Sequence, residues 1–253
     1  MKKPLISILI VLTLTGLLLT PALAAESTAT ANEPFDQGVA LLSQGNYVAA
    51  AEKFTEALKL NPDLPEAYIN RGIARLKLDE PVEAVGDFDK ALELAPNSSE
   101  ALYNRALAYT RGGVYDKALE DYTQALKHAP KDWQILYNRG NTYLDMGKNK
   151  EALADYQRAL KLNPKSPEIL HNRGLAHLNL GQAREALRDA DAALELNPNF
   201  ARAYFIRAGA LEKLDQKYEA MAAYRQFLKV ASPEKDRGLI QQALEHLKKL
   251  EGK

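Results

Sequence analysis

Apolar residues recur every three or four positions along most of this 253-residue chain, which is the spacing of amphipathic helices. The clearest stretch is Trp133 to Ser166, where two apolar blocks run from about Gln134 to Met146 and from about Lys150 to Leu162. Gly147 separates the two blocks, and Asn163-Pro164 ends the second. The pattern predicts a helix, a turn and a second helix. Neither helix buries its apolar face alone, so the rest of the chain has to supply partners.

The rest of the chain repeats this unit with a fixed period of 34 residues. One column of the repeat is proline, at Pro62, Pro96, Pro130, Pro164 and Pro198. Other columns hold small residues, such as Gly38, Gly72, Ala106, Gly140, Gly174 and Ala208, or Ala50, Ala84, Ala118, Ala152, Ala186 and Ala220. A fixed period of this length with helical content indicates a solenoid of stacked units.

The columns resemble those of the tetratricopeptide repeat family, with small residues at positions 8, 20 and 27, an aromatic residue at 24 and Pro at 32. Six repeats fit between Ala31 and Ser232, and Trp133 is position 1 of the fourth. The resemblance implies an all-α, right-handed α-solenoid of six helix-turn-helix repeats. In that family the first helix of each repeat (helix A) lines a concave groove that holds ligands, and the second (helix B) lies outside. The fifth repeat has Ala190 in the aromatic column, which predicts looser packing there.

The two ends of the chain differ from the repeats. We expect a C-terminal capping helix at residues 233–253, which begins with the helix-start sequence Ser232-Pro233-Glu234; a helix that docks a partner is the alternative. Residues 1–24 predict a signal peptide with Lys2 and Lys3, an apolar run and Ala22-Leu23-Ala24 before a cleavage site at Ala24/Ala25. We therefore expect an exported protein, periplasmic or secreted, with a short flexible leader at 25–32. An uncleaved segment would instead anchor the protein in a membrane.

Composition argues against several functional classes. The 33 basic residues balance the 33 acidic ones, so no nucleic-acid partner is expected. The chain has no Cys and only four His, and no two of the His have the spacing of metal ligands. No phosphate-binding glycine motif and no nucleophile motif occurs. We expect no cofactor, no metal and no enzymatic activity; an enzyme subunit with an unrecognised site is the alternative.

Two charged columns occur together. Position 7 is Arg and position 23 is Asp in the second to fifth repeats, at Arg71, Arg105, Arg139 and Arg173 and at Asp87, Asp121, Asp155 and Asp189. The matching columns predict ion pairs between helices A and B, within or between repeats. An Arg-lined binding surface is the alternative interpretation.

The candidate binding residues lie on the expected A helices. Position 6 is Asn in four consecutive repeats, and position 5 adds aromatic rings; together these are Asn70, Asn104, Asn138, Asn172, Tyr103, Tyr137 and His171. An Asn side chain both donates and accepts hydrogen bonds, so such a ladder suits a peptide backbone of any sequence. The alternative is that the Asn residues cap local structure between repeats. The two-carboxylate clamp of chaperone-binding relatives is not expected, because its Lys and Arg are missing around the Asn column. The sequence thus predicts a scaffold or adaptor that binds protein partners.

Overall fold

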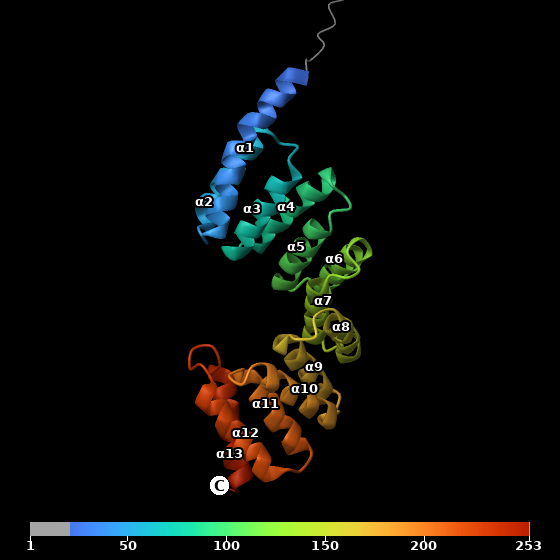
Figure 1. Ribbon diagram of the computed structural model, residues 1–253, viewed down its shortest axis with the longest axis vertical. Helices are drawn as coiled ribbons and strands as arrows, with labels where there is room; N and C mark the ends of the chain where they lie inside the picture. The colour runs from blue at the N-terminus through green and yellow to red at the C-terminus, as the bar shows by residue number, and fades with distance from the viewer. Residues whose placement is uncertain (1–20, 253) are drawn as a thin grey trace, which may run out of the picture.

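The computed structural model describes the backbone of residues 21–252 and the side chains of residues 31–252 (Figure 1). In this part of the chain every regular element is an α-helix, as predicted. The helices are α1 (Pro21–Ser43), α2 (Tyr47–Leu60), α3 (Pro65–Lys77), α4 (Pro81–Leu94), α5 (Ser99–Arg111), α6 (Tyr115–His128), α7 (Trp133–Asp145), α8 (Asn149–Leu162), α9 (Pro167–Asn179), α10 (Ala183–Leu196), α11 (Ala201–Lys213), α12 (Lys217–Val230) and α13 (Arg237–Glu251).

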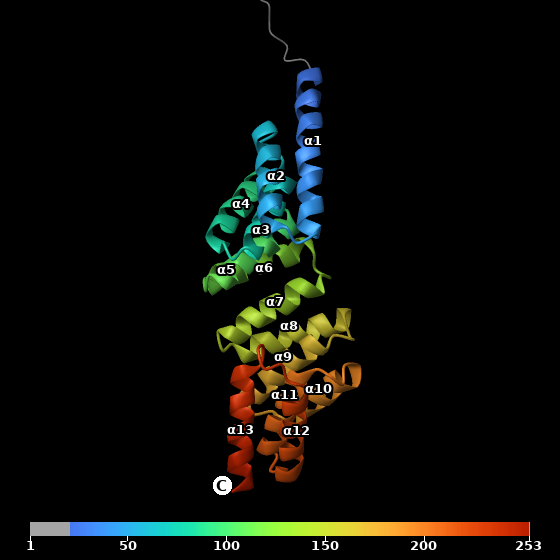
Figure 2. The same ribbon diagram turned by 90° about the vertical axis from the view of Figure 1, so that its left-hand side faces the viewer.

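Consecutive helices pair as the A and B helices of six repeats, and α13 follows the last pair. The pairs stack along the long axis of the molecule, with α1 near one end and α13 near the other (Figure 2). The A helices also contact one another from repeat to repeat, in the pairs α1–α3, α3–α5, α5–α7, α7–α9 and α9–α11. A curved stack is tightest on the side where like helices touch, so the A helices line its inner side. We call this surface the concave face.

The packing of each repeat depends on a small residue facing an aromatic ring. A Cβ atom placed on Gly72 would lie 2.6 Å from Cε1 of Phe88, and one on Gly140 would lie 2.7 Å from the same atom of Tyr156. Both rings are completely buried. The small column therefore exists because the ring at position 24 presses against helix A of its own repeat.

The fifth repeat solves the same packing problem differently. Ala190 replaces the ring, and a Cβ atom on Gly174 would meet Cγ2 of Ile206 at 3.2 Å. Ile206 belongs to the next repeat, is only 3% exposed and packs with Ala186 and Ala190 in one cluster. The looser packing expected here is not found, because this isoleucine occupies the space of the missing ring.

The helix ends follow local rules in most repeats. Gly147 adopts a φ of 72° in the turn between α7 and α8, a left-handed conformation that glycine reaches without steric cost. Ser166 caps α9 by accepting a hydrogen bond from the backbone N–H of Ile169 at 3.3 Å, and Pro167 is the first residue of the helix.

Two boundaries differ from the sequence-based expectation. Helix α13 begins at Arg237 and not directly after Ser232, because the carboxylate of Asp236 accepts the backbone N–H of Ser232 at 3.0 Å and holds the intervening residues in a turn. Residues 25–32, expected to be a flexible leader, lie within α1. The predicted signal peptide up to residue 20 lies outside the described residues.

Candidate functional site on the concave face

The matching Arg and Asp columns form the predicted ion pairs between helices A and B. Arg139 donates from Nε and Nη2 to the two carboxylate oxygens of Asp155, at 2.7 and 2.8 Å. Its Nη1 donates at 3.0 Å to the hydroxyl of Thr123 in the preceding repeat. Asp155 is only 3% exposed. Arg139 therefore joins the helices of its own repeat and ties that repeat to the one before.

The pattern recurs along the solenoid. Arg105 pairs with Asp121 at 2.7 Å in its own repeat and with Asp89 of the preceding repeat at 2.6 Å. The hydrogen bond to Asp121 raises the pKa of Arg105 above its usual range. Equivalent pairs are Arg71–Asp87 at 2.6 Å and Arg173–Asp189 at 2.5 Å. The arginine column is thus occupied in structural pairing, and it offers no free binding surface.

The Asn column lies on the A helices α3, α5, α7 and α9, where the sequence places it. Two of its members connect neighbouring repeats through the aromatic column. Asn138 donates to the hydroxyl of Tyr103 at 2.9 Å, and Asn172 donates to the hydroxyl of Tyr137 at 3.2 Å. Each pair joins position 6 of one repeat to position 5 of the repeat before.

The other two Asn residues lack this link, because the preceding position 5 carries no hydroxyl. For Asn104, the position-5 residue of the repeat before is Ile69. Asn104 instead donates to the carbonyl oxygen of Glu100 in its own helix, at 2.9 Å. Asn104 is only 8% exposed, so it offers little to a ligand. For Asn70, the position-5 residue of the repeat before is Phe35, and the side chain of Asn70 makes no hydrogen bond with any described residue. In the Asn column, Asn138 and Asn172 therefore have a partly structural role, because their Nδ2 atoms join neighbouring repeats. Their Oδ1 atoms stay unpaired among the described residues.

A further residue, Asn141 on α7, connects α8 with α9 and was not among the predicted site residues. Its Oδ1 accepts hydrogen bonds from the hydroxyl of Tyr156 and from Nδ2 of Asn172, both at 2.8 Å. Tyr156 is fully buried beneath the concave face, and burial raises its pKa above the usual range of tyrosine. The network holds Tyr137 and Asn172 in place before any ligand arrives.

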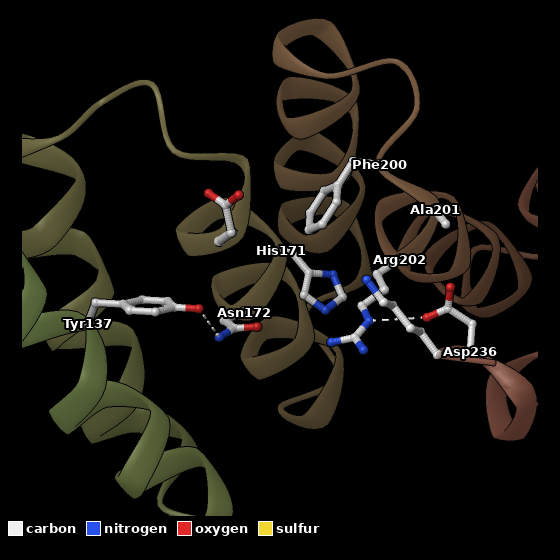
Figure 3. A pocket seen from close by; sticks show the side chains of 9 residues that line it. Tyr137, His171, Asn172, Phe200, Ala201, Arg202 and Asp236 are labelled. Carbon is white, nitrogen blue, oxygen red and sulfur yellow. Dashed lines mark hydrogen bonds and ion pairs between the residues drawn. The ribbon is translucent and has the colours of Figure 1, made fainter. Parts of the chain in front are cut away.

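Three of the seven candidate residues meet at one cavity of about 330 Å³, lined by Tyr137, His171 and Asn172 together with Glu168, Phe200, Ala201, Arg202, Lys235 and Asp236. Figure 3 shows Tyr137 and Asn172 on one side of His171, and Arg202 and Asp236 on the other. We call this cavity the α9–α11 pocket. Sequence reasoning missed its charged wall. The available signal was the change at position 2 of the repeat from Glu168 to Arg202.

His171 forms the floor between these two sides. Its ring meets that of Phe200 edge-on, with centroids 5.6 Å apart and planes at 78°. Neither ring nitrogen has a hydrogen-bond partner among the described residues, and Nδ1 is completely buried. Burial, helped by the nearby positive charge of Arg202, lowers the pKa of His171 to about 4. The imidazole is therefore neutral at pH 7.

Comparison with protein families decides the identity of the fold. Models described as tetratricopeptide repeat or TPR repeat match consecutive parts of the chain, at residues 35–99, 99–132, 121–154, 140–181, 167–200 and 201–233. The chain is a tetratricopeptide repeat protein. None of the curated proteins matches it in sequence.

Solved structures of other tetratricopeptide repeat (TPR) proteins share the fold. YrrB, a TPR protein with an unusual peptide-binding site, is 26% identical with a TM-score of 0.63, over 76% of this chain and 98% of YrrB. A TPR protein from Parabacteroides merdae is 23% identical with a TM-score of 0.69, over 90% of this chain and 93% of its own. PilF from Pseudomonas aeruginosa is 18% identical with a TM-score of 0.71, over 85% of this chain and 99% of its own.

The described residues lack the features of two other kinds of site. They contain no group of three or more His, Asp or Glu side chains arranged to hold a metal ion. None of their helices combines the length and the apolar character needed to cross a membrane.

Proposed function

We propose that this TPR protein is a non-catalytic adaptor or assembly scaffold that binds an extended segment of a partner protein on its concave face. The observation that carries the proposal is the row of position-5 and position-6 side chains on α5, α7 and α9. Tyr103, Tyr137 and His171 supply ring surface there, and the Oδ1 atoms of Asn138 and Asn172 supply unused acceptors. Such acceptors suit the backbone N–H groups of a bound peptide.

The family supports the same general role. The TPR fold, shared with the peptide-binding protein YrrB, is consistent with a protein-interaction scaffold. The rings are also pre-positioned, since Tyr103 and Tyr137 each accept a hydrogen bond from the next repeat. A surface that is ordered before binding loses less conformational entropy when the ligand docks.

Site-specific photo-cross-linking tests the proposal. The photoreactive amino acid p-benzoylphenylalanine would replace Tyr103 or Tyr137 on the concave face, and Gln157 or Tyr218 on exposed B-helix surfaces as controls. Irradiation of cells that express each variant should yield covalent adducts to the same partner from the two concave positions alone. Adducts only from Gln157 and Tyr218 would contradict the concave face as the binding surface.

We further propose that the protein acts in the cell envelope, in the assembly of a complex outside the cytoplasm. The support is the sequence at the amino terminus, where Lys2 and Lys3 precede an apolar run and Ala22-Leu23-Ala24. N-terminal sequencing of the purified natural protein should then begin at or beside Ala25. A protein that retains Met1 and fractionates with the cytoplasm would refute export. Retention of Met1 in the membrane fraction would indicate an anchored form instead.

A further inference from the structure

We propose that the α9–α11 pocket binds the carboxylate of an acidic side chain within the partner segment, so that the groove selects acidic segments. This inference rests on the proposed function. The pocket lies inside the row of A helices, with walls from α7, α9 and α11 and from the turn before α13, so a segment lying along the concave face passes over it.

The two cations of the pocket, Arg202 and Lys235, keep most of their N–H groups unpaired among the described residues. Nε of Arg202 lies 3.4 Å from Oδ1 of Asp236, and its two Nη atoms have no hydrogen-bond partner among the described residues. The side chain of Arg202 is 53% exposed. Nζ of Lys235 likewise has no hydrogen-bond or ion-pair partner among the residues that the structure describes. Cationic N–H groups that have no hydrogen-bond partner at a pocket wall attract an anionic acceptor from a ligand.

The carboxylates of the pocket already accept hydrogen bonds, whereas most N–H groups of its cations donate none. Asp236 accepts a hydrogen bond from the backbone N–H of Ser232 at 3.0 Å, in addition to its contact with Arg202. Glu168 accepts a hydrogen bond from the hydroxyl of Ser166 at 2.9 Å. The unused hydrogen-bonding groups therefore include four N–H bonds of the Arg202 guanidinium and the three of the Lys235 ammonium. A ligand rich in acceptors and negative in charge complements this surface.

Two uncharged rings line one wall of the pocket. His171 and Phe200 provide ring surface on which the methylene groups of an acidic side chain can pack. Since Nε2 of His171 also has no hydrogen-bond partner among the described residues and is not buried as Nδ1 is, a ligand oxygen or a bridging water can pair with it. The volume of about 330 Å³ holds a glutamate side chain together with part of its backbone.

The charges elsewhere along the concave face give the bound segment a direction. Position 2 of the second, third and fifth repeats carries Glu66, Glu100 and Glu168, all exposed and without an ion pair among the described residues. The same position carries Arg202 in the last repeat. A carboxylate is therefore favoured near α11 and disfavoured near α3 and α5. We infer that the acidic part of the segment lies over the C-terminal repeats.

The test uses two synthetic pools of acetylated, C-terminally amidated dodecapeptides. The central residue is Glu in one pool and Gln in the other. In both pools every other position is randomised among neutral residues. Fluorescence anisotropy with the purified full chain should give about tenfold tighter binding of the Glu pool, as expected for a charge-assisted hydrogen bond. Amidation removes the terminal carboxylate, so any preference reports on the side chain.

A charge-matched pair of variants assigns the preference to the pocket. The double variant Arg202→Gln/Lys235→Gln should bind the two pools equally. The control Arg184→Gln/Arg188→Gln removes the same charge from exposed positions on α10 and should keep the full preference. Circular dichroism of both variants checks that they remain folded.

The outcomes separate this inference from the proposed function. Equal binding of the two pools by the wild-type chain would overturn the carboxylate site but leave peptide binding intact. A preference that persists in Arg202→Gln/Lys235→Gln would also overturn it. Absence of saturable binding for either pool would contradict both proposals.

Discussion

Arg139 and Asp155 show how a single side chain can belong to two repeats. The guanidinium of Arg139 makes two hydrogen bonds within its repeat and a third to Thr123 of the repeat before. Buried ion pairs of this kind fix geometry, and their net contribution to stability is small because both charges lose water. Loss of one partner is different, because it leaves the other charge buried and unpaired.

The ion-pair column therefore predicts a large effect from one substitution. Asp155→Ala should lower the free energy of unfolding by about 3 kcal/mol, because it strands the guanidinium of Arg139, whose side chain is 13% exposed. Urea denaturation followed by circular dichroism measures the change. Asp191→Ala is the matched control, since Asp191 is 46% exposed in its pair with Arg207 and should cost less than about 1 kcal/mol. Equal losses in the two variants would show that burial does not govern these pairs.

His171 predicts a pH dependence of stability. Its pKa in the folded protein, about 4, lies below the ordinary value of 6.5, so the unfolded chain binds a proton that the native state does not. The stabilisation is complete above pH 6.5 and is lost as the pH falls toward 4. Between pH 7.5 and pH 4.5 the wild-type chain should lose roughly 2–3 kcal/mol more than His171→Phe. Parallel pH profiles of the two proteins would contradict a neutral, buried imidazole.

At the residue scale, sequence reasoning found the contacts whose two partners form matching columns. Arg and Asp occur together in the second to fifth repeats, which reveals their pairing. The link from Asn138 to Tyr103 was hidden, because it depends on how one repeat is placed on the next. The α9–α11 pocket was hidden for the same reason, since Lys235 and Asp236 lie in a turn that falls outside the repeat.

Helices α9 to α11 show how neighbouring elements compensate for one another. The aromatic column fails at Ala190, and the Asn column fails at Ile206 in the following repeat. The two exceptions occupy one cluster, because Ile206 fills the space beside Gly174 that a ring fills elsewhere. Two departures from the repeat pattern are thus a single packing change shared by two repeats.

This compensation can be tested by a double-mutant cycle. Ile206→Ala should lower the free energy of unfolding by about 2–5 kcal/mol through the cavity it leaves. Ala190→Tyr alone should cost about 1–3 kcal/mol by overpacking the same space. The double variant should be more stable than Ile206→Ala, because the ring replaces the lost volume. Additive losses measured by urea denaturation would show that the two positions do not share one space.

At the scale of elements, the helix bounds were largely predictable from sequence. The expected limits of the fourth repeat differ by about one residue from α7 and α8. The failures lie where the repeat ends. Ser232-Pro233-Glu234 has the composition of a helix start, but the carboxylate of Asp236 captures the N–H of Ser232 and delays the helix to Arg237. Only the folded turn brings those two groups together.

The whole molecule is a stack in which each repeat contacts mainly its neighbours. Deletion of Trp133 to Ser166 should therefore leave a folded, shorter solenoid. The new junction places Asn172 against Tyr103 and Arg173 against Thr123, which are the partners that Asn138 and Arg139 use now. The mean residue ellipticity at 222 nm should stay unchanged and unfolding should stay cooperative. A random-coil spectrum would show that the fold depends on contacts beyond nearest neighbours.

At the same scale, the fold follows from the sequence because a phased repeat specifies its own neighbours. The binding role does not follow as directly, since a concave face is defined only once the repeats are stacked. The Asn column illustrates the difference. Sequence placed it on the A helices correctly, but only the structure shows that Asn104 is buried and that Asn138 and Asn172 also join repeats.

The central claim, that the concave face binds a segment of a partner protein, is tested most directly by one affinity comparison. The segment cross-linked from Tyr137 would be synthesised as a peptide and titrated against the wild-type chain, Tyr137→Ala/Asn172→Ala and the outer-surface control Arg184→Ala/Arg188→Ala, all verified as folded. The account predicts that the concave-face variant raises Kd about tenfold or more while the control leaves it unchanged. A Kd that is the same for the wild-type chain and Tyr137→Ala/Asn172→Ala would contradict it.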